Sequence, residues 1–450
     1  MQLAGMMAAA PQTSLPKQCG SWRDLKAAYR LLNNPAVDPD AIQDVHRRLT
    51  RDACAKHAVV LSVQDDTYLS FNSRAHTKGL GKLATGKGRG LVQHGTLAVT
   101  PTGELLGLLD EFWFRRIDAP EQETRKQRNA RWRERDVWSD AVRRVGPAPA
   151  QTRFVHVMDR AGDSLETIRA CDEVGVGYVI RAKHDRRVED ATDKLWSFMG
   201  KQSIRHRMTV SIGKQTDMTG RVTRRARQAK LSVRFSRVQL ECSWNHSGSS
   251  KEPKLVFVVY LSEDRPPKDV DPVDWMLLTG EAVTTVPDAE RIVEWYTRRW
   301  VIEEWHRVEK EGCRVEASQL DDAEDIKRLA AIISITAVRM LRLRDLAGFT
   351  TKHKSVRSEA KKPSQDPKAL QEAVPTSWLV VVASLAGTDP FELTPRSFWL
   401  TIAKRGGWIG RKSDGHPGWK TIWRGWYDVH IMATGVELAA ERPDLLEKCG

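Results

Sequence analysis

The clearest alternation of hydrophobic and polar positions in the chain runs from residue 288 to residue 312. At about 100° per residue, Tyr296, Arg299, Glu303 and Lys310 fall on one polar strip about 60° wide. Tryptophans and branched aliphatic residues cover the opposite side. This period predicts a single amphipathic helix. The polar strip alone is also typical of a surface helix that simply faces solvent.

Two short apolar runs predict buried strands, and each leads directly into aspartate. Residues 58–64 lead into Asp65 and Asp66, and residues 153–158 lead into Asp159. A helix over 164–174 and a strand over 177–180 complete a βαβ-like unit, which continues into Arg181 and Lys183. Catalytic groups often lie at strand ends in α/β folds, although an ordinary Asp-rich turn would give the same local pattern.

Patterns elsewhere predict mostly short elements around this unit. Residues 1–20 are expected to be disordered, residues 185–275 are rich in alternating strand patterns, and residues 350–376 form a polar, Lys-rich linker. The tail from residue 377 is expected to be helical, with tryptophans making core or interface contacts. The remaining expected elements are helices over 22–32, 38–50, 122–144 and 323–346, a hairpin of 91–99 with 105–114, and a strand over 275–279.

The charge of the chain indicates a polyanionic partner. Among the 450 residues, 72 Lys and Arg against 58 Asp and Glu leave a net charge of +14. The excess is local, because residues 181–230 hold 14 Lys and Arg but 5 Asp and Glu, a balance of +9. A concentrated basic patch favours nucleic acid as the partner.

Several function classes are not supported by the sequence. The six cysteines are scattered without a C-x-x-C pair, so reduced thiols are expected rather than a zinc site or disulfides. No apolar run reaches the ~20 residues of a membrane span, and the first residues lack the basic leader of a secretory signal. The segment Gly81-x4-Gly86-Lys87 resembles a phosphate-binding loop, but Gly88 replaces the Ser or Thr that binds magnesium, so no nucleotide cofactor is expected.

Two strand-end aspartates and one helical glutamate are a suitable ligand set for hard divalent cations. Magnesium prefers carboxylate oxygens, and two ions about 4 Å apart can activate an attacking oxygen and stabilise the leaving oxygen of a phosphodiester. Neighbouring Arg and Lys side chains would bind the phosphates of the DNA backbone. The best chemical interpretation is metal-dependent phosphoryl transfer on DNA.

The spacing Tyr296-x2-Arg299-x3-Glu303-x6-Lys310 resembles the Tyr-Arg-Glu-Lys signature of bacterial cut-and-paste transposases, the IS-four family with its Tn-five type members. The segments 64–71 and 158–160 are similar to that family's two aspartate segments, and 179–184 to the basic strand that follows. The segment 403–407, with tryptophans of 419–426, resembles its C-terminal dimerisation region. The similarity extends from about residue 27 to residue 426.

This resemblance implies an α/β fold with a ribonuclease-H-like core, a mixed sheet with flanking helices, interrupted by a β-rich insertion. Helical regions would lie at both ends of the chain. The expected division is 1–57 for an N-terminal helical region with a shortened DNA-binding part, 58–184 and 273–348 for the two parts of the core, 185–272 for the basic insertion, 349–376 for a linker, and 377–450 for C-terminal helical dimerisation.

The resemblance also implies a catalytic and metal-binding triad of Asp65, Asp159 and Glu303 that holds two Mg²⁺ or Mn²⁺ ions. Asp66 stands where the family usually has Thr, so either Asp65 or Asp66 could be the first ligand. The implied DNA-binding residues are Tyr296, Arg299, Lys310, Arg181, Lys183 and Trp275. Trp275 occupies the place of a tryptophan that stacks on a flipped base, although a plain core role is equally compatible with the sequence.

The implied reaction is nicking of the transposon end, hairpin formation and strand transfer into target DNA. The partners would be double-stranded DNA and a second copy of the chain on that DNA, in a bacterial cytoplasm and at the nucleoid when bound. Two alternatives are a truncated, non-catalytic DNA-binding or dimerising inhibitor of a full-length transposase, and a general metal nuclease. The short segment before residue 27 motivates the inhibitor.

Overall fold

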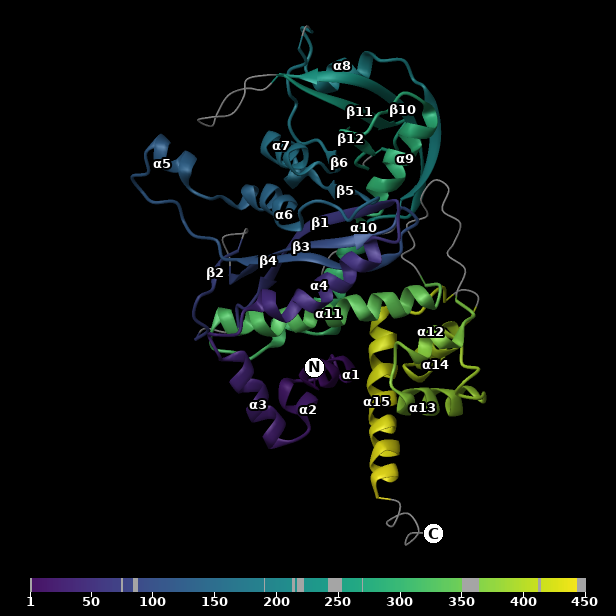
Figure 1. The fold of residues 1–450 in the computed structure, drawn as a ribbon. Coiled ribbons are helices and arrows are strands. Elements are labelled where there is room, and N and C mark those ends of the chain that lie inside the picture. Colours follow the sequence, from purple (N-terminus) through teal and green to yellow (C-terminus); the bar gives the residue numbers. More distant parts are fainter. Residues whose placement is uncertain are drawn as a thin grey trace.

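The protein, seen as a computed structural model, is built on one large mixed sheet with helices on both faces (Figure 1). The residues described are 2–73, 76–83, 88–189, 191–212, 215–216, 222–241, 253–268, 270–349, 364–411 and 414–442. The strands of the sheet are β1 (Val59–Ser70), β2 (Gly81–Lys82), β3 (Arg89–Val99), β4 (Leu105–Phe114), β5 (Arg153–Met158), β6 (Gly177–Arg181), β7 (His206–Ile212), β10 (Arg227–Leu240), β11 (Lys254–Glu263) and β12 (Asp274–Thr279). Their order is β2-β3-β1-β5-β6-β12-β11-β10-β7, and β4 also pairs with β3. The short strands β8 (Gln215–Thr216) and β9 (Val222–Arg224) pair with each other.

The centre of the sheet lies at β1, which has a different kind of neighbour on each side. Its parallel pairing with β5 ends at Val63 and Val157, whereas its antiparallel pairing with β3 continues to Ser70 and Gly90. The prediction that the strand ends at Asp65 is therefore wrong. The strand continues because β3 supplies backbone partners along its whole length, and only the β5 side becomes open beyond Val63.

The helices include two at the N-terminus, where disorder was predicted. That prediction is wrong for α1 and α2, whereas the predicted helices that became α3 and α4 are confirmed. The helices up to the middle of the chain are α1 (Gln2–Ala9), α2 (Leu15–Cys19), α3 (Trp22–Leu32), α4 (Pro39–Cys54), α5 (Arg125–Ala130), α6 (Val137–Val145), α7 (Leu165–Val174) and α8 (Leu195–Lys201). The later ones are α9 (Val286–Thr297), α10 (Trp300–Arg307), α11 (Ala323–Leu346), α12 (Pro367–Gln371), α13 (Thr376–Ala386), α14 (Pro395–Arg405) and α15 (Trp419–Glu441).

Each face of the sheet has its own hydrophobic core. Helices α6 and α7 pack on one face, where Trp138 and Ile168 lie against alternate residues of the strands. Helices α9, α10 and α11 cover the other face, with Ile302 and Trp305 fully buried beneath it. Because successive strand residues point to opposite faces, neighbouring residues of β1 are sent to different helical layers.

Helix α11 separates the sheet from the terminal helices. The sheet lies on one side of it, and α1–α3 together with α12–α15 lie on the other (Figure 1). It has 24 residues, so it is about 36 Å long, enough to contact both terminal groups. Its predicted range of 323–346 is confirmed.

The segment predicted as one helix over 288–312 is divided into three pieces. Helix α9 begins at the capping box of Thr285 and Asp288 and ends at Thr297. Backbone N–H groups of residues 298, 299, 301 and 302 then donate to carbonyls three residues earlier, which tightens the turn before α10. Val308–Gly312 forms one π-helical turn. Hydrophobic periodicity cannot reveal these one-residue changes of phase.

Other expected elements are confirmed or corrected in the same way. The hairpin of β3 and β4, the βαβ unit, β12 and the helical tail are confirmed. The predicted helix 122–144 is divided into α5, a short 3₁₀ turn at Glu134–Asp136, and α6. The basic segment expected as an insertion contributes β7, β10 and β11 to the same sheet through β12.

The expected linker lies partly outside the described residues, since 350–363 are not described, and α12 forms within its remainder. Residues 84–87, part of the segment that resembles a phosphate-binding loop, also lie outside the described residues. Of the helices that the structure describes, none combines the length and apolar character needed to cross a bilayer. Four of the six cysteines lie in the described part, and all four are free, buried thiols.

Candidate active site

Asp65 of β1 and Glu303 of α10 meet at one guanidinium, that of Arg299. The Arg299 Nη1 lies 2.8 Å from Asp65 Oδ2, and its Nη2 donates to Glu303 Oε1. The Arg299 side chain is 12% exposed and that of Asp65 is 15% exposed, whereas that of Glu303 is 35% exposed. Arg299 therefore acts as a largely enclosed cation between two of the predicted ligands.

Burial and neighbouring charge perturb the protonation of this cluster. Burial raises the pKa of Asp65 to about 6, against the effect of Arg299, and the charges of Asp159 and Glu303 act in the same direction as burial. Burial also raises the pKa of Glu303. For Arg299, burial alone would lower the pKa, but the carboxylates of Asp65 and Glu303 outweigh it and the pKa is raised. A site that concentrates negative charge in this way is suited to cations.

Asp159 follows the last residue of β5, as predicted, and lies within electrostatic range of Asp65. Its Oδ1 accepts a hydrogen bond of 2.7 Å from the backbone N–H of Ala161, which fixes the carboxylate at the start of a 3₁₀ turn. It lies on the side of β1 where pairing with β5 has already ended at Val63. The three predicted triad carboxylates are thus brought to one open edge between β1 and β5.

Asp66 points to the other face of the sheet. Its Oδ1 lies 2.5 Å from Nδ1 of His94, a fully buried side chain on β3. His94 in turn contacts the side chain of Gln64, whose Nε2 lies 2.7 Å from Nδ1 of His156. Because β1 alternates, only Asp65 shares a face with Arg299 and Glu303.

A glycine on β3 allows α10 to approach Asp65 closely. Gly95 is the antiparallel partner of Asp65, and a Cβ at Gly95 would lie 2.4 Å from the Trp305 ring. The Trp305 side chain is fully buried, and its Nε1 donates to Ser334 O at 3.1 Å. Trp305 therefore anchors the helix that carries Glu303 to the sheet.

The predicted base-stacking tryptophan forms a second group beside the carboxylates. Trp275 on β12 contacts Tyr296 edge to face, with ring centroids 5.3 Å apart. Tyr296 is buried rather than exposed on a solvated strip, and this burial raises its pKa, while Arg299 and a hydrogen bond with Arg181 lower it. Arg181 is held by a 2.8 Å hydrogen bond from its Nη2 to Asp274 O. Tyr296, Trp275 and Arg181 therefore lie together next to Arg299.

The two predicted lysines lie on other segments, after β6 and after α10. Lys310 is on the π-helical turn, where burial lowers its pKa and Glu316 opposes that effect. Glu316 also accepts the backbone N–H of Ser70 at the end of β1. Lys183 is exposed, and its backbone N–H donates to the buried carboxylate of Asp163 at 2.6 Å.

Two sets of supporting residues were not predicted from the sequence. Glu304, next to Glu303, accepts hydrogen bonds from Arg344 of α11 and Trp419 Nε1 of α15, each at 3.1 Å. This joins the C-terminal helices to α10. No local sequence pattern distinguishes Glu304, because its partners are distant in the chain.

The second set is a buried carboxyl pair, Glu111 and Glu309. Ser334 Oγ lies 2.6 Å from Glu111 Oε1 and 2.9 Å from Glu309 Oε1, and Gln93 Nε2 contacts both carboxyl groups. Burial raises the pKa of each, so the pair retains a proton in neutral solution. A carboxyl inside the apolar run of β4 was the one available signal.

The donor set at the edge of β1 is suited to divalent cations. Its oxygen ligands are those that magnesium and manganese prefer. Among the residues described, no three His, Cys, Asp or Glu side chains are close enough together to form a ready-made metal centre. In this geometry Arg299 provides the positive charge between Asp65 and Glu303. The residues therefore fit a cation chemically, provided that Arg299 releases them.

Two family models match the chain. Residues 1–37 match a transposase DNA-binding domain, and residues 131–339 match a transposase DDE domain. The first match includes the helices α1 and α2, where disorder had been expected. The second contains Asp159 and Glu303, and together with the mixed sheet and its flanking helices it confirms the predicted ribonuclease-H-like core.

Proposed function

Since the chain is a DDE transposase, an enzyme that cleaves DNA and transfers strands, we propose that it moves an insertion sequence by a cut-and-paste route of the IS-four, Tn-five type. The observation that carries this proposal is the meeting of Asp65, Asp159 and Glu303 around Arg299. The Tyr296, Arg299, Glu303 and Lys310 spacing supports the same subgroup.

DDE transposase domains generally use divalent metal ions. In this proposal Asp65, Asp159 and Glu303 hold two Mg²⁺ or Mn²⁺ ions, which when bound activate the attacking oxygen and stabilise the leaving oxygen. Asp65 is the first ligand in this proposal, because it shares Arg299 with Glu303, whereas Asp66 contacts His94. Asp65 is held within β1, and the carboxylate of Asp159 is fixed directly after β5 by the backbone N–H of Ala161.

Arg299 exchanges its carboxylate partners for a phosphate of the scissile strand. Tyr296 donates its hydroxyl to a neighbouring phosphate, and Arg181, Lys183 and Lys310 neutralise backbone charge around the site. Trp275 receives a base that is unstacked when the strand bends into a hairpin. Its contact with Tyr296 keeps the indole beside the phosphate-binding groups.

The proposed reaction begins when water attacks the phosphodiester at the transposon end and releases a 3′-hydroxyl. That hydroxyl attacks the opposite strand and makes a hairpin, which water reopens before the end is joined to target DNA. A second copy of the chain pairs the two ends, and the reaction takes place on chromosomal DNA in the bacterial cytoplasm.

The test uses the two ends of the element that encodes this chain, each as a duplex labelled on one strand. Incubation with Mg²⁺ should give nicked DNA first, and then a hairpin that migrates as a single strand of double length on a denaturing gel. A plasmid target should acquire the end. Nicks without hairpins would refute the proposed hairpin route, and cleavage of any duplex equally would favour a general nuclease. Binding without cleavage would favour an inhibitor.

A further inference from the structure

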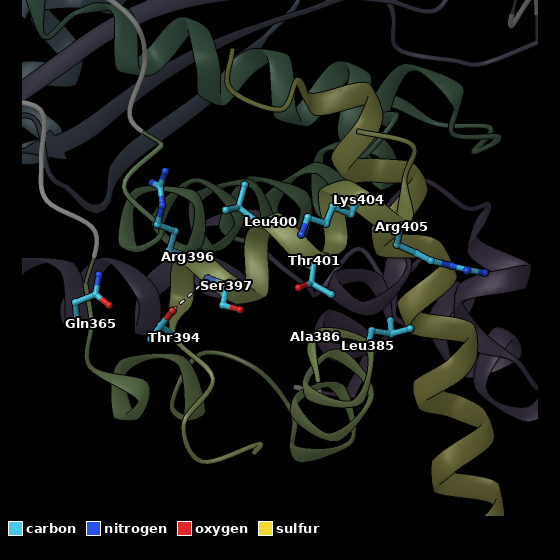
Figure 2. A pocket seen from close by; sticks show the side chains of 10 residues that line it. All are labelled: Gln365, Leu385, Ala386, Thr394, Arg396, Ser397, Leu400, Thr401, Lys404 and Arg405. Atoms are coloured by element: carbon cyan, nitrogen blue, oxygen red, sulfur yellow. Dashed lines mark hydrogen bonds between the residues drawn. The ribbon is translucent and has the colours of Figure 1, made fainter. Parts of the chain in front are cut away.

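A groove in the C-terminal helices has the composition of a phosphate-binding surface. It lies along α14, across from Leu385 and Ala386 at the end of α13, and has a volume of about 460 Å³ (Figure 2). Ten residues of the described part line it; three of them are Lys or Arg and none is Asp or Glu. The helix α14, which supplies most of its lining, lies on the side of α11 opposite the sheet that carries β1 (Figure 1).

The polar face of α14 is a consequence of its packing. Phe398, Trp399 and Ile402 are buried on the inner side of the helix. Ser397, Thr401 and Lys404 follow at helical spacing on the side that borders the groove (Figure 2). Two hydroxyls and an ammonium are thereby presented in a row.

The cations of the groove are held in different ways. Arg396 is stacked on Phe349, 4.7 Å from the ring centroid, with a 3.5 Å contact from Nη1 to Ala347 O. This fixes the guanidinium while using one of its five N–H groups. Lys404 is exposed. Arg405 pairs with Asp428 at 3.1 Å, but both side chains are about half exposed, so the pair exchanges for another anion at small cost.

We propose that this groove binds the phosphate backbone of duplex DNA, as a second DNA-binding surface separate from the carboxylate site. From Arg396 to Lys404 the helix rises about 12 Å, a length over which its cations can reach several phosphates of one strand. Hydroxyls combined with Arg and Lys are the usual ligands of DNA phosphates. The contacts involve no base edge, so the binding is independent of sequence. The inference rests on the proposed role of the chain on DNA.

The experiment measures binding of a random-sequence duplex in EDTA by fluorescence anisotropy, at 50 to 200 mM KCl. Each phosphate contact contributes about 0.9 to the slope of log K against log salt. The variant Arg396→Gln/Lys404→Gln/Arg405→Gln should lower that slope by two to three. Over this salt range the affinity of the wild type should therefore fall roughly 16- to 64-fold more than that of the variant.

The control is Lys368→Gln/Lys420→Gln/Arg424→Gln, which removes the same charge from exposed positions of α12 and α15 outside the groove. The slope of log K against log salt for this control should differ from the wild-type slope by less than one. Equal slopes for the two triple variants would overturn the proposal. If the first variant does not fold, Lys404→Gln/Arg405→Gln should still lower the slope by about two, and an unchanged slope would overturn the proposal.

This outcome is distinguishable from failure of the proposed reaction. The binding assay contains no metal and involves no cleavage. A groove variant that binds DNA like the wild type would refute the groove proposal without contradicting the proposed cleavage at the carboxylate site. Conversely, a chain that never makes a hairpin could still show the salt dependence predicted for the groove.

Discussion

Replacing Arg299 with Gln should weaken the metal-free fold and strengthen metal binding. Arg299 holds Asp65 at 2.8 Å and also pairs with Glu303. Removing one partner of an enclosed ion pair costs about 3–5 kcal/mol, and the Glu303 contact adds little because it is more exposed. Since Asp65 is itself partly accessible, we expect a loss of about 2 kcal/mol. The melting temperature in EDTA should fall by several degrees.

The same substitution removes a competitor of the metal. In the wild type, a cation that binds Asp65 and Glu303 must first release the guanidinium, so the free energy of that interaction is subtracted from its binding. An interaction of about 1.4–2.8 kcal/mol corresponds to a 10- to 100-fold weaker affinity. Arg299→Gln should therefore bind Mn²⁺ at least tenfold more tightly without DNA, while cutting DNA poorly because it lacks a phosphate ligand.

Free Mn²⁺ can be followed by electron paramagnetic resonance, and thermal unfolding can be measured with and without the ion. The matched control is Arg298→Gln, because Arg298 Nε donates to Pro101 O at 2.8 Å, away from the carboxylates. Its Mn²⁺ affinity should equal that of the wild type. An unchanged or weaker affinity in Arg299→Gln would refute the idea that Arg299 competes with the metal.

Three further predictions concern the packing around α10. Gly95→Ala places a methyl group 2.4 Å from the Trp305 ring. It should therefore lower the free energy of unfolding, measured in urea, by about 1–3 kcal/mol and reduce cleavage. Wild-type stability and cleavage would contradict the close packing of Trp305 on Gly95. Trp419→Phe removes the indole N–H that donates to Glu304, so it should lower the free energy of unfolding by about 1 kcal/mol and also slow cleavage. A change in stability alone would show that the contact does not position α10. Burial raises the pKa of Glu309, so the folded state retains a proton that the unfolded state loses. The free energy of unfolding should therefore fall as the pH rises from about 5 to about 8. Urea unfolding midpoints measured across this range should change less with pH in Glu309→Gln than in the wild type.

Elements with a strong period were predictable from the sequence. The helix α11 and the hairpin of β3 and β4 have long, regular patterns with clear ends, and local patterning was sufficient for both. Helices α1 and α2 were missed. Their segment has little amphipathic contrast, and α1 packs against α11, far away in the sequence.

The errors near the site have a common physical origin. The continuation of β1 past Asp65 depends on β3, and the break before α10 depends on four hydrogen bonds of the 3₁₀ type. Neither the continuation of the strand nor the break in the helix can be recognised from the composition of its own segment. The carboxylate set came from a family resemblance, and the choice between Asp65 and Asp66 needed the alternation of a paired strand. The links from Glu304 to Trp419 and from Glu111 to Glu309 join distant segments, which no local pattern reveals.

The most direct test of the proposed metal site compares Asp65→Asn with Asp66→Asn in Mg²⁺-dependent cleavage of the element's own ends, alongside Asp159→Asn and Glu303→Gln. Loss of a metal-binding carboxylate should remove about 4 kcal/mol of transition-state stabilisation, or roughly 1,000-fold in rate. We predict that loss for Asp65, Asp159 and Glu303, and less than about tenfold for Asp66, whose partner is His94. Full activity of Asp65→Asn with loss of activity in Asp66→Asn would contradict the assignment of Asp65, Asp159 and Glu303 as the metal-binding carboxylates.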